Sequence, residues 1–301
     1  MTFLKKSSSL LLFVLLNFSS VLIATESNSW AHKTLKTMSL DEKIGQLFMI
    51  AGYVDSEFAQ KETGNPKIVE EIDCYITEYH VGGIAYVGPS ESHKQVTLTN
   101  HYQAISKYPI LIAQDLEWGL SMRLIDGMQF PKNITLGAVD NHDLIYEMGK
   151  EIGNQAKLIG VHMNLSPVID VNIDPENPVI NARSFGSSPK LVAEKGIAMI
   201  RGLQDAGIIA SAKHFPGLGD ITTDPHLSLP YSQHDKKRLQ DIELYPFAQA
   251  IKAGVLSIQT EALLIPSLEP DPHTPASLSS NVINGVLKKE LGFTGLVLSG
   301  A

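Results

Sequence analysis

The sequence is poor in cysteine and has fewer basic than acidic residues. Its 301 residues contain a single cysteine, Cys74, so no disulfide and no cysteine metal cluster can form within it. Cys74 lies in a helix-like stretch, where we expect it to pack in the core as a small hydrophobe. Lysine and arginine number 24 against 32 acidic residues, and no basic run offers a phosphate-binding stripe. These deficits exclude a disulfide-rich domain and argue against nucleic acid as a partner.

Long apolar runs are also scarce, and the one that stands out lies within residues 1–24. Two lysines precede the apolar stretch 10–16, and a small residue, Ala24, closes the segment. This order is typical of a secretory signal peptide. Polar residues within 17–20 interrupt the run before the ~20 residues that span a bilayer, which disfavours an uncleaved anchor. We therefore expect export to the periplasm or the extracellular space, with no stable membrane insertion after signal removal.

After this segment, strand patterns alternate with helix patterns along the whole chain. Short apolar runs predict seven strands, at 47–50, 81–87, 109–113, 161–165, 208–212, 255–258 and 295–298. Amphipathic stretches predict the intervening helices, the clearest being 39–46, 66–80, 144–158, 189–205, 236–253 and 278–291. Repeated β-then-α units indicate a parallel sheet covered by helices, either an open doubly wound sheet or a (β/α)8 barrel.

Two features favour the barrel. No Gly-rich dinucleotide fingerprint follows the first strand. Polar residues end several different strands, as expected where βα loops ring one mouth: Asp115, Asp170, Lys213 with His214, and Glu261. The sequence thus predicts an α/β fold, a (β/α)8 TIM barrel that lacks its last β/α unit in this chain. We expect the signal peptide to span 1–24 and the barrel domain to span 25–301.

The most informative stretch is 212–226, where a strand pattern ends in Lys213 and His214 and opens into a Gly/Pro turn. Asp224 and His226 follow two residues apart, a spacing at which a carboxylate can fix the tautomer of an imidazole and raise its basicity. Taken alone, His226 is better explained as an ordinary loop histidine, whereas the upstream Lys-His-Phe-Pro-Gly motif favours a catalytic role. A metal site made of Asp220, Asp224 and His226 is a weaker alternative, because no cysteine or second well-spaced histidine supports it.

Motifs from about residue 38 to the end resemble glycoside hydrolase family 3, in its β-N-acetylhexosaminidase branch. Any one motif is weak, but Lys-His-Phe-Pro-Gly at 213–217 with a downstream Asp-x-His is specific. The others follow in the family order: Leu-Asp-Glu-Lys-Ile-Gly-Gln-Leu-Phe at 40–48, Ser-Pro-Val-Ile-Asp-Val-Asn at 166–172, Arg-Ser-Phe-Gly at 183–186 and Leu-Gly-Phe-Thr-Gly at 291–295. The stretch 117–124 is most similar to exported Bacteroidetes-type members.

The resemblance implies a barrel enzyme that removes terminal non-reducing β-linked N-acetylglucosamine with retention of configuration. His226 matches the general acid/base, with Asp224 as its carboxylate partner. The positions that match sugar-binding residues are Asp115, Arg123, Arg183, Lys213 and His214. The implied substrate is an amino-sugar oligosaccharide or a muropeptide, from peptidoglycan or chitin-type chains. The resemblance implies no metal and no cofactor.

The chain also departs from the family pattern. Gly300 stands where the family has its aspartate nucleophile, Leu218 replaces a histidine, and Glu261 lies in a Thr-Glu-Ala run where the family shows Thr-Ala-His. The eighth β/α unit is missing. Alternatives are therefore a fragment of a longer enzyme, a decayed product, and a sugar-binding pseudoenzyme. Glu261 is the nearest spare carboxylate, and the sequence favours a solvated loop acid there over a substitute nucleophile. A family 3 β-glucosidase is a second alternative, which the Asp224–His226 pair disfavours.

Overall fold

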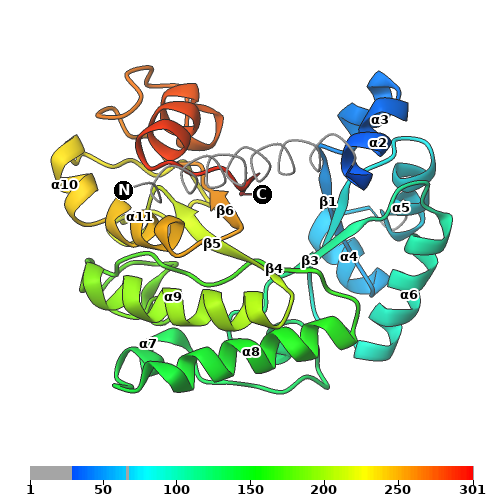
Figure 1. Ribbon diagram of the computed structural model, residues 1–301, viewed down its shortest axis with the longest axis horizontal. Coiled ribbons are helices and arrows are strands. Elements are labelled where there is room, and N and C mark those ends of the chain that lie inside the picture. Colours follow the sequence, from blue (N-terminus) through cyan, green and yellow to red (C-terminus); the bar gives the residue numbers. More distant parts are fainter. Residues whose placement is uncertain (1–28, 66–67, 301) are drawn as a thin grey trace, which may run out of the picture.

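The fold is a curled parallel sheet with helices on its outer side (Figure 1). The computed structural model describes residues 29–65 and 68–300, so the predicted signal peptide lies outside the described residues. Seven strands pair in sequence order: β1 (Met49–Gly52), β2 (Gly83–Tyr86), β3 (Leu111–Gln114), β4 (Met163–Asn164), β5 (Ile209–Phe215), β6 (Ser257–Thr260) and β7 (Leu296–Ser299). This order is that of an incomplete (β/α)8 barrel, which confirms the predicted fold class.

The strands pair without a break from β1 to β7, and the register shifts once, between Ala212 and Phe215 where β5 pairs with β6. Gly83 pairs with both Met49 and Leu111, and Asn164 pairs with both Gln114 and Ala210. All pairs are parallel, so the carboxyl ends of the strands meet at one rim of the sheet. The first and last strands each have one paired neighbour and form the two edges of the sheet.

Helices connect the strands and cover the outer face of the sheet (Figure 1). They are α2 (Trp30–Thr37), α3 (Leu40–Gly45), α4 (Ser56–Thr63), α5 (Ile68–Thr77), α6 (Ser92–Ile105), α7 (Asn133–Gly137), α8 (His142–Leu158), α9 (Pro189–Asp205), α10 (Lys236–Asp241) and α11 (Leu244–Lys252). Short 3-10 turns are η1 (Leu120–Met122), η2 (Asn181–Arg183) and η3 (Ala276–Leu278), and η4 (Asn281–Glu290) is a π-helix. No helix in the described ranges is long and apolar enough to cross a bilayer.

Local sequence explains where several helices begin. Ser39 and Glu42 form a reciprocal capping box at the start of α3. Ser188 accepts from the backbone of Leu191 at the start of α9, and Pro189 fills the first turn, where a missing N–H costs nothing. The start of α9 at Pro189 is therefore as predicted.

Several predicted boundaries were wrong, including the three that follow. Leu47 and Phe48 do not open β1: their N–H groups bond to the carbonyls of Ile44 and Gly45, so they continue the turn that ends α3. They are also 84% and 59% exposed, whereas the prediction treated them as buried. The predicted helix 236–253 is two helices, α10 and α11, and β5 extends three residues further than expected, through Phe215.

Cys74 was also predicted wrongly, because it is exposed and not in the core. The buried residues of α5 are Ile72 and Ile76, four apart on one face. Cys74 lies midway between them in sequence, about half a helical turn away, and so points off the buried face.

Candidate active site

The carboxyl-end rim of the sheet carries a cluster of buried charged side chains. Asp115 follows β3 directly, and Lys213 lies within the part of β5 that the sequence did not predict as strand. Lys213 Nζ is 2.5 Å from Asp115 Oδ1, and Arg123 Nη2 is 2.6 Å from Asp115 Oδ2. Asp115 therefore contacts two other predicted sugar-binding residues, one of which, Lys213, is 98 residues away in the chain.

Glu117 completes this cluster, and the sequence analysis did not propose it as a site residue. Its carboxylate lies 2.7 Å from Arg183 Nη2, 3.0 Å from Arg183 Nε and 3.0 Å from Lys213 Nζ. The fork-like contact with Arg183 is the bidentate geometry that guanidinium favours. The signal available in the sequence was the position of Glu117, two residues beyond Asp115 in the loop that follows a strand.

The cations keep both carboxylates ionised. Burial raises the pKa of the Asp115 carboxyl, but the charges of Lys213 and Arg123 outweigh it and hold that pKa well below its ordinary value. Burial likewise opposes ionisation of Glu117, and Lys213 with Arg183 lowers its pKa from 4.5 to about 2. In this network Lys213 is 3% exposed and its amine contacts both carboxylates. The cluster is therefore a fixed set of compensated charges at neutral pH.

His214 is held by a second buried carboxylate, Asp170. The His214 Nδ1 atom lies 2.7 Å from Asp170 Oδ2, and the His214 backbone N–H donates to the same oxygen at 3.1 Å. Asp170 Oδ1 accepts from the backbone of Leu218 at 2.7 Å. A carboxylate on Nδ1 favours the tautomer with the proton there, which leaves Nε2 free to accept from Arg183 at 3.3 Å. The peptide bond between Lys213 and His214 is cis.

The predicted acid/base pair lies on a separate loop. Asp224 Oδ1 is 2.7 Å from His226 Nδ1 and also accepts from the His226 backbone N–H at 2.9 Å. These two bonds, the backbone one first, lower the pKa of Asp224. The His226 side chain is 72% exposed, so its Nε2 edge faces solvent. The pair has the geometry of a tautomer-fixing dyad, but the structure shows no direct contact between it and the buried cluster.

Gly300 lies immediately after β7, beside Glu261 at the end of β6. A Cβ atom built on Gly300 would be 2.5 Å from Oε2 and 2.6 Å from Oε1 of Glu261. Two departures from the family pattern, at positions 261 and 300, are therefore neighbours in space. The carboxylate occupies the room in which a side chain at position 300 would begin.

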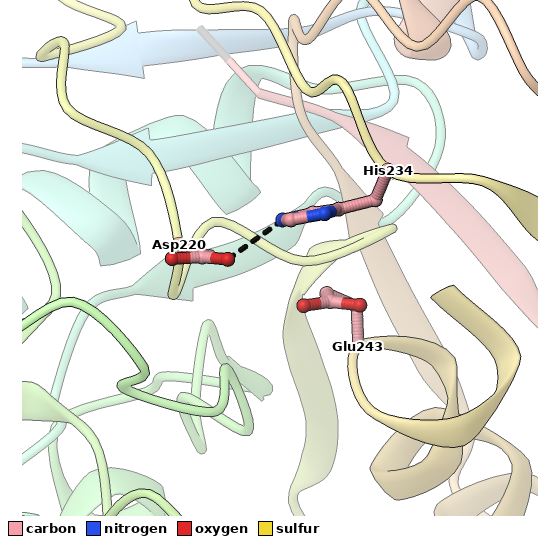
Figure 2. A group of neighbouring side chains, drawn as sticks. All are labelled: Asp220, His234 and Glu243. Carbon is pink, nitrogen blue, oxygen red and sulfur yellow. Dashed lines mark hydrogen bonds and ion pairs between the residues drawn. The ribbon is translucent and has the colours of Figure 1, made fainter. Parts of the chain in front are cut away.

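Another group of charged side chains, made of Asp220, His234 and Glu243, lies near the rim (Figure 2). Asp220, His234 and Glu243 place their ligand-type atoms within 4.8 Å of one another, and His234 Nε2 is 2.6 Å from Asp220 Oδ2. Arg238 Nη2 contacts Asp220 at 3.2 Å and Glu243 at 2.9 Å. Because this guanidinium already compensates the two carboxylates, we describe the group as an ion-pair network. Asp220 is thus grouped with His234 and Glu243, and the metal site considered from the sequence, with Asp224 and His226, is not formed.

A barrel-type parallel sheet with polar residues at the carboxyl ends of its strands is an architecture that enzymes use, and comparison with known proteins identifies the family of this chain. Residues 39–301 match the model of the glycosyl hydrolase family 3 N-terminal domain. The chain therefore belongs to glycosyl hydrolase family 3, as the resemblance predicted.

Similar proteins include β-hexosaminidases. The chain is 30% identical over 300 residues to β-hexosaminidase A of Pseudoalteromonas piscicida, covering 90% of this chain and 50% of that protein. It is 34% identical over 228 residues to a β-hexosaminidase of Nitrosomonas eutropha, covering 73% of this chain and 64% of the relative. The chain thus spans about half the length of the first of these relatives.

A solved structure has the same fold. The family 3 β-N-acetylglucosaminidase from Paenibacillus sp. str. FPU-7 superposes with a TM-score of 0.77 at 36% identity, covering 88% of this chain and 49% of that one. A NagZ from Neisseria gonorrhoeae, solved in complex with N-trifluoroacetyl-D-glucosamine, superposes with a TM-score of 0.72 at 25% identity. These similarities agree with the β-N-acetylhexosaminidase branch that the motifs indicated.

Proposed function

We propose that this protein is an exported β-N-acetylhexosaminidase that hydrolyses terminal non-reducing β-linked N-acetylglucosamine with retention of configuration. The observation that carries the proposal is the compensated cluster of Asp115, Lys213, Glu117 and Arg183 at the rim of a family 3 sheet. The substrate class is an amino-sugar oligosaccharide or muropeptide, which places the protein in the turnover of peptidoglycan or chitin-type chains.

The cluster suits a neutral, hydroxyl-rich ligand. The side chains of Asp115, Arg123 and Arg183 are 18%, 26% and 22% exposed, so each keeps polar atoms within reach of a ligand, while Lys213 behind them is buried. A carboxylate accepts from sugar hydroxyls and a guanidinium donates to them. Their mutual ion pairs fix these groups in place before the ligand arrives, which reduces the entropy lost on binding.

The Asp224–His226 pair supplies proton transfer in this proposal. Asp224 holds Nδ1, so the exposed Nε2 of His226 donates a proton to the leaving oxygen and later takes one from water. Imidazole is the side chain best suited to donate and then take up a proton in this way.

The test is turnover of aryl N-acetyl-β-glucosaminide compared with aryl β-glucoside. We expect hydrolysis of the first, release of the β-anomer by NMR, and little action on the second. His226→Gln should lower kcat by roughly 10²–10⁴-fold for a poor leaving group and much less for dinitrophenolate, which needs no proton. Equal turnover of the two sugars would contradict the proposed specificity.

A sugar-binding protein without turnover is the second candidate, because Gly300 has no side chain to form a covalent intermediate. Isothermal titration with N-acetylglucosamine distinguishes the two. Binding in the absence of any aryl-glycoside hydrolysis favours the binding protein, whereas binding with hydrolysis favours the enzyme.

A further inference from the structure

The ends of β6 and β7 bring a carboxylate to the rim. Thr260 pairs with Ser299, and the N–H of Gly300 donates to the Thr260 carbonyl at 2.6 Å. Glu261 follows Thr260, and its two oxygens lie 2.5 and 2.6 Å from the point where a Cβ of residue 300 would be. The carboxylate group of Glu261 therefore fills the space next to the backbone at position 300.

The backbone of Glu261 is hydrogen-bonded to the strand that carries Lys213 and His214. The backbone N–H of Glu261 donates to the Phe215 carbonyl at 2.8 Å. Lys213 and His214 immediately precede Phe215 in the same strand, and both are buried at the rim. Glu261 is thus one strand away from the residues proposed to bind the sugar.

Glu261 also differs from the other rim carboxylates in its partners. Asp115 and Glu117 are each paired with two cations, Asp170 with His214 and two backbone N–H groups, and Asp224 with His226. Within the described ranges, Glu261 forms no ion pair, and its one side-chain hydrogen bond comes from the adjoining Ala262 N–H to Oε1 at 2.8 Å. Its Oε2 oxygen has no hydrogen-bond partner among the described residues, whereas the other carboxylates are held by ion pairs or hydrogen bonds.

We propose that Glu261 is the catalytic nucleophile of this protein, a role that rests on the function proposed above. In the first step a Glu261 oxygen attacks the anomeric carbon and the bond from that carbon to the leaving oxygen breaks. The bonding pair goes to the leaving oxygen, which takes the proton from Nε2 of protonated His226. In the second step His226 takes a proton from water, the water oxygen bonds to the anomeric carbon, and the carboxylate leaves with its electrons. The sum is one glycosidic bond and one water converted into two hydroxyl groups.

The first test replaces the carboxylate in the full chain. Glu261→Gln keeps the shape of the side chain, and Glu261→Ala opens a space that a small anion can enter. Both should lower turnover of dinitrophenyl N-acetyl-β-glucosaminide on the order of 10³-fold, because the covalent step is lost. Sodium azide should restore turnover in Glu261→Ala and yield the α-glycosyl azide. Glu290→Gln is the matched control, since that carboxylate pairs with Lys236 on the surface, and it should keep wild-type turnover.

The second test moves the carboxylate from position 261 to position 300, directly after β7. Gly300→Asp alone crowds a second charge against Glu261 and should lower turnover. The double variant Glu261→Ala/Gly300→Asp relieves the contact and should recover more turnover than Glu261→Ala. A 5-fluoro glycosyl fluoride of N-acetylglucosamine should add one glycosyl mass to the wild-type protein, and peptide mapping should find it on Glu261.

The outcomes separate this inference from the proposed function. Binding of N-acetylglucosamine by the wild type with no hydrolysis would overturn the role of Glu261 and leave a sugar-binding protein. Hydrolysis that survives Glu261→Ala within a few-fold, or labelling at another residue, would overturn the role and leave the glycosidase. Absence of both binding and hydrolysis would overturn the two together. Circular dichroism on each variant shows whether a loss of turnover is a loss of fold.

Discussion

Lys213 is the residue on which the buried charges of the rim depend. Its amine contacts Asp115 and Glu117 at 2.5 and 3.0 Å, so each carboxylate shares this cation with one arginine of its own. The three charges are largely removed from water, where an unpaired ion is costly. Any change at Lys213 therefore acts on two carboxylates together.

We predict that Lys213→Met destabilises the protein by about 3–5 kcal/mol, the usual cost of removing one partner from a buried ion pair. Urea unfolding followed by circular dichroism measures this loss, and N-acetylglucosamine affinity should fall with it. Lys237→Met is the matched control, because that exposed lysine pairs with Asp241 one helical turn away and should change stability very little. Equal losses of unfolding free energy in the two variants would show that the buried ion pairs of Lys213 stabilise the protein no more than a surface pair does.

Glu117 gives the protein a dependence on pH whose sign follows from its lowered pKa. The pKa is 4.5 in the unfolded chain and about 2 in the folded one, so the unfolded state takes up the proton first on acidification. The stabilisation from Glu117 is thus fully present above pH 4.5 and is lost as the pH falls toward 2.

We expect the free energy of unfolding to decline between pH 4.5 and pH 2, and Glu117→Gln to flatten that decline. Urea melts at half-unit pH steps provide the measurement. The variant should also be less stable at pH 7, because Arg183 and Lys213 lose a charged partner. A Glu117→Gln protein with the same acid slope as wild type and Glu290→Gln would refute this account.

The site residues were predicted with uneven success, for physical reasons. Asp115, Arg123, Arg183, Lys213 and His214 do gather at the rim, because residues at the ends of parallel strands share one edge. Glu117 was missed since a single acidic residue in a loop has no spacing pattern. The roles of all these residues, and of Asp224 and His226, stay predictions until tested.

At the scale of elements, α8 and α9 pack closely through glycine. A Cβ on Gly202 of α9 would lie 2.1 Å from the Tyr146 carbonyl oxygen and 2.7 Å from the Lys150 backbone nitrogen of α8. A Cβ on Gly149 of α8 would likewise lie 2.7 Å from the Met199 carbonyl oxygen of α9. The two helix backbones approach at these points, and a side chain would force them apart.

Gly202→Ala should destabilise the protein by roughly 1–3 kcal/mol through overpacking, although alanine is the better helix former. Gly285 in η4 is the matched control, since nothing lies within 4 Å of a Cβ added there. Gly285→Ala should instead stabilise by about 0.5–1 kcal/mol. Differential scanning calorimetry on both variants gives the two signs, and the same sign at both positions would contradict the packing argument.

Element boundaries show where sequence periodicity fails. The start and end of α9 were predicted to the residue, because a serine cap, a proline and a sustained apolar face agree with one another. The start of β1 was placed two residues early, since the apolar pair Leu47 and Phe48 has strand-like composition but is used as a turn. Apolar character alone does not distinguish a buried strand from an exposed turn.

At the scale of the whole molecule, the curled sheet has two edges that expose apolar surface. A hollow of about 560 Å³ beside β1 is lined by residues that include Phe48, Ile50 and Tyr75. On the opposite edge, Leu296 of β7 is 43% exposed. Exposed apolar patches of this kind favour association with other chains.

We predict that the exposed apolar side chains around this hollow make the protein self-associate at micromolar concentrations and that Phe48→Lys weakens this association several-fold. Sedimentation velocity across a concentration series provides the measurement. Leu158→Lys is the matched control: Leu158 is 83% exposed, more than Phe48 at 59%, but lies at the end of α8, away from the hollow, so its substitution should leave association unchanged. A monomer at all concentrations would contradict the prediction.

The sequential strand order also bears on how the protein is made. Each strand pairs with the one synthesised just before it, so the sheet can grow strand by strand as the ribosome extends the chain. The ion pairs at the rim cannot form in that order, because Asp115 precedes its partner Lys213 by 98 residues. At a synthesis rate of ~5–20 residues per second, Asp115 and Glu117 are made roughly 5–20 seconds before Lys213, the cation that they share. During that interval the nascent sheet must keep its rim open to water.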